Sequence, residues 1–132
     1  MDKGELSKSL SVSASALAAQ ATRLRHVAEN ISQADTPGYR RKTVSFEAVR
    51  DATGTVERVS VGRVQLDQSD LNRIYDPSNP LADETGNYDG SNVDLMIEIA
   101  DAREAQRSYE ANLKMFDQAR QMSSALLDLL RR

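Results

Sequence analysis

Apolar residues recur at every third or fourth position through the first part of the chain, from about Glu5 to Ala34. Such steps place side chains on one stripe of an α-helix, close to the repeat of a coiled coil. No Pro or Gly interrupts the run after Gly4, so we predict one long N-terminal helix. Many of its positions are Ala or Ser, which predicts a helix that forms fully only against a packing partner. The stripe consists of Leu6, Leu10, Ala14, Leu17, Ala21, Leu24, Ala28 and Ile31.

A second pattern of this kind fills the last part of the chain, from about Asn92 to Leu130. Charged residues fall largely off the apolar stripe, so we predict a second and longer helix. Ser91 or Asn92 suits its N-cap, with Asp94 near the positive end of the helix dipole. The stripe consists of Ile99, Ala102, Ala105, Tyr109, Leu113, Phe116, Ala119, Met122, Leu126 and Leu130.

The first helix should stop at Asp35-Thr36-Pro37-Gly38-Tyr39. Pro37 cannot continue a helix and disfavours helical geometry at Thr36. A Pro-Gly pair suits the two central positions of a type II turn, where Gly takes a positive φ. We therefore predict a helix stop followed directly by a tight turn.

The middle of the chain, about residues 40–91, predicts short strands and loops. Residues 43–49, 56–61 and 64–66 are rich in β-branched residues and partly alternate, which is typical of strands. Residues 51–54 form a plausible turn between the first two. Residues 76–90 are rich in Pro, Asn, Asp and Gly, which predicts an irregular loop.

Together these patterns predict a mainly α fold. Long N- and C-terminal helices pair as a coiled-coil-like bundle, and a small β-rich or irregular segment lies between them in the chain. The expected bounds are 1–35, 36–91 and 92–132, as one discontinuous helical domain with a small insertion. Aromatic residues make up only 5% of the 132 residues, which favours an elongated helical shape over a closed globule.

Charge is uneven along the chain. Residues 1–50 hold eight basic and five acidic residues, whereas residues 51–92 hold three and eight. Copies of the chain could complement one another head to tail through this difference, or it could be ordinary scatter of surface charge. No region is basic enough to indicate nucleic acid as a partner. No apolar run approaches the roughly 20 residues that span a bilayer, and the polar N-terminus does not resemble a cleaved signal peptide.

The sequence offers only weak candidates for catalytic or metal-binding residues. His26 has no second His or Cys at metal-ligand spacing and is expected on the solvated surface. The acidic stretch 83–94 departs from a calcium-binding loop, because Tyr88 stands where the invariant Gly belongs. The basic cluster Arg40-Arg41-Lys42 could contact another subunit or remain a solvated loop. We therefore predict no catalytic residue, no metal, no cofactor and no small-molecule substrate.

Two motifs carry a family resemblance. Residues 28–40, with Asn30 before Thr36-Pro37-Gly38-Tyr39, resemble the signature of flagellar rod, hook and hook-associated proteins. A second group, Tyr75-Asp76-Pro77 followed by Ser91-Asn92-Val93-Asp94, is similar to the loop that leads into the last helix of proximal rod proteins. Asp35 and Leu95 depart from the residues that are frequent in the family, Asn and Pro.

The resemblance implies a structural subunit of the proximal rod of the flagellar basal body, part of the drive shaft and of the wall of the export channel. It also implies export without a cleaved signal peptide, a location spanning the periplasm and no insertion into the membrane. The expected partners are further copies, other rod proteins, and the membrane-ring and rod-base adaptor proteins. The main alternative is a cytoplasmic helical adaptor or export chaperone. The residues expected to pack between subunits are Leu6, Leu10, Leu17, Leu24, Ile31, Ile99, Tyr109, Leu113, Phe116, Met122, Leu126 and Leu130.

Overall fold

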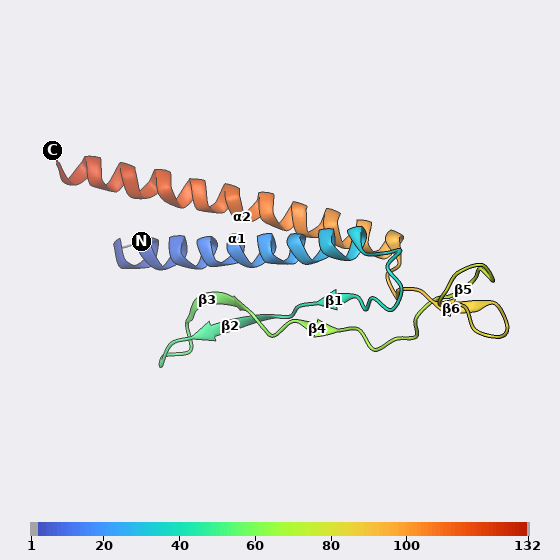
Figure 1. Ribbon diagram of the computed structural model, residues 1–132. Helices are drawn as coiled ribbons and strands as arrows, with labels where there is room; N and C mark the ends of the chain where they lie inside the picture. Colours follow the sequence, from blue (N-terminus) through green and yellow to red (C-terminus); the bar gives the residue numbers. More distant parts are fainter. Residues whose placement is uncertain (1–2, 132) are drawn as a thin grey trace.

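Two long antiparallel helices dominate the computed structural model, which describes residues 3–131 (Figure 1). Helix α1 spans Lys3–Ser32 and helix α2 spans Leu95–Leu130. The two helices lie side by side, and α2 extends past the N-terminal end of α1. The predicted fold class, two paired helices with a small strand-containing middle, is confirmed. The expected outer bounds also took in residues 1–2 and 132, which lie outside the described residues.

The turn after α1 has the predicted geometry. The amide of Tyr39 donates to the carbonyl oxygen of Thr36 at 3.2 Å, and Gly38 has a φ of +78°. A type II turn requires a positive φ at its third residue, which a side chain with a Cβ rarely adopts. The Thr36–Tyr39 motif therefore reverses the chain beside the end of α1.

The N-cap of α2 differs from the prediction of Ser91 or Asn92. Asp94 caps the helix, and its side chain accepts a hydrogen bond from the Met96 amide at 3.0 Å. The two predicted caps make tertiary contacts instead, because Ser91 donates to the Ala34 carbonyl and the side chain of Asn92 accepts from the Arg41 amide. Helix α2 consequently begins at Leu95, three residues later than expected.

Replacing Asp94 by Ala should lower the free energy of unfolding by about 1 kcal/mol, because the first turn of α2 loses its side-chain acceptor. Urea unfolding of the purified chain measures the change. Asp94→Asn is the matched control and should stay close to the unsubstituted chain, since Asn caps about as well as Asp. Equal losses in both variants would contradict a capping role.

Three two-stranded antiparallel ladders make up the middle segment. Strand β1 (Lys42–Thr43) pairs with β4 (Gln65–Leu66), and β2 (Phe46–Arg50) pairs with β3 (Val56–Val61). The predicted first strand is therefore interrupted at residues 44–45. Strand β5 (Arg73–Tyr75) pairs with β6 (Asn87–Asp89), so part of the predicted irregular loop is a hairpin.

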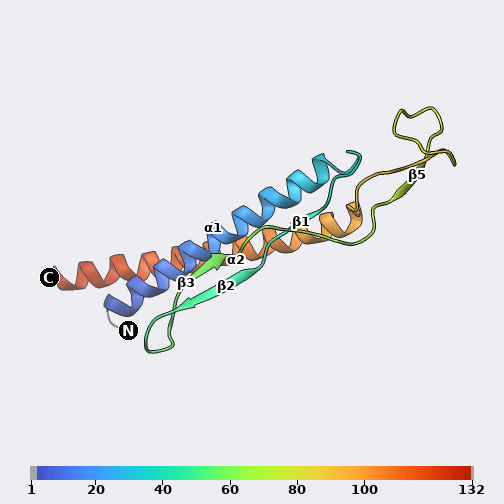
Figure 2. The ribbon, with the colours of Figure 1, turned by 60° about the horizontal axis from the view of Figure 1, so that its bottom comes forward.

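The hairpins occupy different places on the molecule. The β2–β3 hairpin runs along the outer side of α1, where the Val59 amide donates to the Ser15 hydroxyl oxygen at 2.8 Å (Figure 2). The β5–β6 hairpin projects beyond the end of the helix pair that is remote from both termini (Figure 1). The structure is therefore a rod with one side covered and one end extended.

The apolar core is small. Only six apolar residues are buried in the described chain, and three of them are alanines: Leu6, Ala19, Val27, Val93, Ala105 and Ala119. Of the twelve residues expected to pack between subunits, Leu6 is buried and six are half-buried, namely Leu10, Leu17, Leu24, Tyr109, Phe116 and Leu126. The other five are exposed in the single chain: Ile31, Ile99, Leu113, Met122 and Leu130. Much of each sequence stripe therefore faces away from the partner helix.

Candidate functional site

The two family motifs meet at one place, where the end of α1, the turn, β1 and the start of α2 come together. We call this place the junction and define it by Asn30, Tyr39, Arg41, Asn92 and Glu98. Its side chains come from two stretches that are distant in sequence, residues 30–41 and 92–98. The junction therefore forms only when segments far apart in the chain pack against one another.

Asn30 stands at the centre of the junction and is 1% exposed. Its amide nitrogen donates to the Lys42 carbonyl at 3.0 Å and to Glu98 Oε2 at 3.3 Å. Its carbonyl oxygen accepts from the Lys42 amide at 2.9 Å and from the Tyr39 hydroxyl at 2.7 Å. Two donors and an acceptor oxygen on one short side chain suit this role, so the side chain fixes both the turn and β1 against α1.

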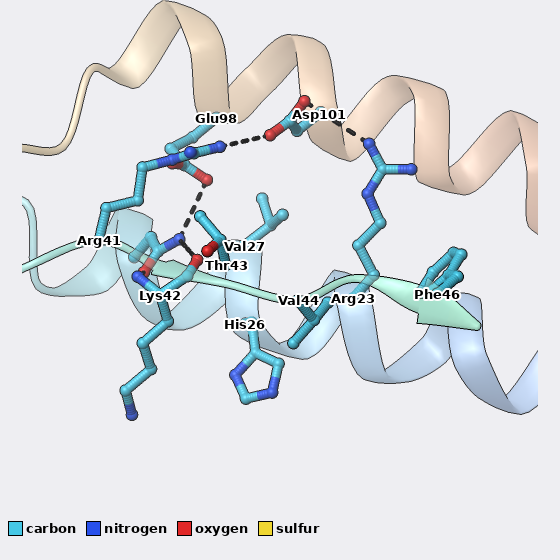
Figure 3. A pocket seen from close by; sticks show the side chains of 11 residues that line it. Arg23, His26, Val27, Arg41, Lys42, Thr43, Val44, Phe46, Glu98 and Asp101 are labelled. Carbon is cyan, nitrogen blue, oxygen red and sulfur yellow. Dashed lines mark hydrogen bonds and ion pairs between the residues drawn. The ribbon is translucent and has the colours of Figure 1, made fainter. Parts of the chain in front are cut away.

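Glu98 is the most buried charged residue, with no exposed surface. Figure 3 shows Arg41 reaching from the strand segment towards two acidic residues of α2. The Nε of Arg41 donates to Glu98, and its Nη2 donates to Asp101 at 2.6 Å. Burial tends to lower the pKa of Arg41, but the hydrogen bond and the charge of Glu98 outweigh it and raise that pKa. A buried carboxylate needs such a fixed cation, so Arg41 and Glu98 lock the middle segment to α2.

Further ion pairs extend from the junction along the helices. Arg23 of α1 lies 3.6 Å from Asp101 and 3.5 Å from Glu104. Lys42 lies 2.6 Å from Glu29, and this hydrogen bond lowers the pKa of Glu29 and raises that of Lys42. These pairs are partly exposed, so each contributes little to stability.

Asn92 joins the second motif to the junction. Its side-chain oxygen accepts from the Arg41 amide at 2.6 Å, and its nitrogen donates to the carbonyl oxygens of Asp67 and Ser69. The neighbouring Val93 is buried. Of the family-motif residues, Asn30, Tyr39, Asn92 and Val93 therefore come together, with Thr36, Pro37 and Gly38 supplying the turn.

The remaining motif residues lie elsewhere. Tyr75 is 71% exposed in the β5–β6 hairpin, and Asp76 and Pro77 follow it there. Tyr75 and Pro77 lie over Gly86, where a Cβ would come within 2.8 Å of the Tyr75 ring. These residues shape the hairpin and do not take part in the junction.

The hairpin contains a carboxylate that makes its stability depend on pH. Asp83 accepts from the Thr85 hydroxyl at 2.6 Å and from the Thr85 and Asn87 amides, and it pairs with Arg73 at 2.7 Å. The hydrogen bond from Thr85, then the Asn87 amide and Arg73, hold the pKa of Asp83 far below its ordinary value. A carboxyl with a depressed folded pKa stabilises the structure above its unfolded pKa, and this is lost as the pH falls.

We therefore expect the β5–β6 hairpin to loosen as the pH falls below about 4, the pKa of an unfolded Asp. Amide exchange of Tyr88 across that range, followed by NMR, measures the loosening. Asp83→Asn should remove most of this pH dependence. If amide exchange in that variant kept its full pH dependence, other carboxylates would be responsible for it.

A cavity of about 320 Å³ opens beside the junction, between α1, the strand segment and α2 (Figure 3). Val27, Val44 and Phe46 form its apolar side, and Arg23 and Arg41 its charged side. His26 also lines the cavity and is half-buried, so the expectation of a solvated surface residue was wrong. The strand segment covers this side of α1, which the helical pattern alone does not show.

The geometry favours a structural role for the junction. The charged groups that line the cavity are paired: Arg23 and Arg41 with acidic residues of α2, and Lys42 with Glu29. His26 also lines the cavity, and its buried Nδ1 makes no hydrogen bond. Among residues 3–131, no group of three or more His, Cys, Asp or Glu could hold a metal ion. Within the same range, neither helix is long and apolar enough to cross a membrane.

Both ends of the chain match models of known protein families. A family model described as flagella basal body rod protein matches residues 10–40, which contain Asn30 and the turn. A second model, described as flagellar basal body rod FlgEFG protein C-terminal, matches residues 84–129. Both ends of the chain thus resemble the class of flagellar basal-body rod proteins, as the two motifs indicated.

Individual relatives identify the family within this class of rod proteins. The flagellar basal-body rod protein FlgC of Agrobacterium fabrum is 46% identical over 96% of each chain. The FlgC proteins of Salmonella typhimurium and Bacillus subtilis are 36% and 32% identical, over 89% and 92% of this chain and 92% and 95% of theirs. The chain therefore belongs to the FlgC family of flagellar basal-body rod proteins.

Proposed function

We propose that this chain is a polymerising structural subunit of the flagellar proximal rod and assembles through its two terminal helices. The observation that supports this proposal most is that far more large apolar side chains are exposed than buried. Among the described apolar residues larger than Ala, only Leu6, Val27 and Val93 are buried. By contrast, helix α2 alone exposes ten large apolar residues, namely Leu95, Met96, Ile97, Ile99, Leu113, Met115, Met122, Leu127, Leu129 and Leu130.

Exposed apolar area of this extent is unusual for a monomer and is typical of a protein that is buried in an assembly. The side chains are distributed along the whole of α2, so more than one neighbour is needed to cover them. A single heterologous contact, repeated with a rotation that does not close, builds a helical tube. Family membership and this surface together support a rod subunit without catalytic activity.

The finer parts of the proposal concern place and partners. As a rod subunit, the chain would stand in the part of the basal body that spans the periplasm and would leave the cytoplasm through the flagellar export channel, without a cleaved signal peptide. Its neighbours would be further copies, other rod proteins, and the membrane-ring and rod-base adaptor proteins. The helices would form the channel wall, and the strand segment, which covers one side of α1, would face outwards.

Quantitative mass spectrometry of purified hook–basal bodies, compared with the soluble cytosol of the same cells, tests the proposal. We expect several copies per particle. If this chain is abundant in the cytosol but missing from the particles, the rod assignment is contradicted and a helical adaptor or export chaperone is favoured. That alternative explains two amphipathic helices but does not account for the family match.

A further inference from the structure

Helix α2 carries an exposed apolar face beside its contact with α1. We call it the methionine face and define it by Met115, Met122 and Leu129, which are 58%, 49% and 63% exposed. Ala111 precedes them, Gln118 and Ala125 lie between them, and all three are also exposed. Successive positions are four and three residues apart, which is the spacing that a second helix can follow. The partner that this face fits is therefore a helix.

Helix α1 carries an uncovered face with the same spacing. Two of its sides are occupied, one by α2 and one by β3. The third side alternates steps of four and three, and every member is exposed. We call it the small-residue face, and it consists of Ser7, Ser11, Ala14, Ala18, Ala21, Arg25, Ala28 and Ser32.

We propose that the methionine face of one copy packs against the small-residue face of α1 in a second copy, as one of the repeating contacts of the rod. This proposal rests on the proposed function and specifies the helix faces that meet. Long flexible side chains such as Met fill irregular gaps, and small residues leave such gaps and let helix backbones approach. Large side chains on one face and small ones on the other make the two complementary in shape.

Charge complementarity fixes the register. Arg25 is the one charged residue of the small-residue face. Glu104 continues the methionine face towards the start of α2, and its side chain is 69% exposed, with only a 3.5 Å contact to Arg23. An antiparallel pairing that sets Arg25 opposite Glu104 therefore joins two unlike charges at the edge of the contact.

This register also matches every later step of the two faces. Four residues earlier on α1 and four residues later on α2, Ala21 faces Ser108. The pairs that follow are Ala18 with Ala111, Ala14 with Met115, Ser11 with Gln118 and Ser7 with Met122. Each pair sets a small residue opposite its neighbour on the methionine face, and no two large side chains coincide. One ion pair thus sets residues 7–25 of the small-residue face against residues 104–122 of α2, and Leu129 lies beyond the paired length.

The contact cannot form within one chain. At 3.6 residues per turn, the methionine face lies about a quarter-turn from the buried Ala105 and Ala119 of α2. The small-residue face lies nearly opposite Arg23 and Asn30, the α1 residues that reach α2. Neither face therefore points at the other within one chain. A second copy on the methionine face would keep the direction of the first and present its own methionine face to a third. Such a contact is heterologous and open-ended, as a rod requires.

Cysteine cross-linking tests the contact without background, because the chain has no Cys. The variants Ala14→Cys and Met115→Cys are produced together in cells that build the rod, and isolated basal bodies are oxidised. We expect a disulfide-linked dimer that carries one chain of each kind. The matched control replaces Met115→Cys by Lys114→Cys, an adjacent exposed position about 100° round the helix, and should lose the dimer band.

The outcomes separate this contact from the proposed function. If the unsubstituted chain is present in basal bodies but neither pair cross-links, or both cross-link equally, the contact is wrong and the rod assignment stands. Absence of the unsubstituted chain from basal bodies would contradict the rod assignment itself.

A charge exchange gives a second test that does not need cross-linking. Arg25→Glu and Glu104→Arg should each reduce incorporation into basal bodies, and the double variant should restore it. A pair that acts only within one chain, such as Glu104 with Arg23, would show no rescue by Arg25→Glu. Failure of the double variant to recover incorporation beyond either single variant would overturn the proposed register.

Discussion

Replacing Arg41 by Ala is expected to lower the free energy of unfolding by about 3–5 kcal/mol, because Glu98 would remain buried without its cation. Glu98 has no exposed surface, and the Arg41 side chain is 19% exposed. Asn30 alone cannot replace the lost charge, since it offers a single neutral donor to Glu98. Urea unfolding of the purified chain, followed by circular dichroism, measures the change.

Two further variants distinguish this cause from a general effect of losing an arginine. Arg107→Ala removes an exposed Arg of α2 and should change the free energy of unfolding by no more than about 0.5 kcal/mol. The double variant Arg41→Met with Glu98→Leu should recover much of the loss, because an apolar pair can replace a buried ion pair. If Arg41→Ala were as stable as the unsubstituted chain, the junction would not hold the middle segment to α2.

The second large effect concerns assembly. Leu17 and Leu113 lie on equivalent apolar stripes in the sequence, but we expect different results when each is replaced by Asp. Leu17 is half-buried on α1, whereas Leu113 is 40% exposed on α2. Leu17→Asp should lower the stability of the chain and abolish incorporation and motility, because it places a charge at a half-buried apolar site of α1. Leu113→Asp should abolish incorporation and motility while the urea midpoint of the purified chain stays nearly unchanged.

Lys114→Asp is the matched control for Leu113→Asp, because it introduces the same carboxylate at the next exposed position. It should keep swimming and incorporation close to normal. Swarming plates and the protein content of isolated basal bodies measure both outcomes. Normal motility of Leu113→Asp at unchanged protein levels would show that this side of α2 does not pack against a neighbour.

The sequence predicted those parts of the fold that depend on local interactions. The 3–4 spacing of apolar residues located both helices, because it is set by the helical repeat itself. The end of α1 was also predictable, since Pro37 and Gly38 restrict the backbone whatever surrounds them. The β2 and β3 segments followed from their β-branched residues, and their turn from residues 51–54.

Long-range contacts account for what the pattern missed. Ser91 and Asn92 suited the N-cap by residue type, but each is engaged with another part of the chain, which left the cap to Asp94. His26 was expected in solvent because a helical pattern does not show that a strand segment covers it. The buried Glu98 gave one signal, a carboxylate within the apolar run Leu95-Met96-Ile97-Glu98-Ile99.

The sequence by itself determined that this protein is a pair of long helices with a tight turn and a thin strand segment, and its two motifs indicated the family. These features are local, or are carried by short runs of residues, so they can be identified without coordinates. Only the tertiary structure decided that the two motifs meet around Asn30 and Glu98, and which apolar positions face the partner helix. That choice depends on how the helices are rotated about their axes, and the rotation is set by contacts between residues that lie 12 to 81 positions apart.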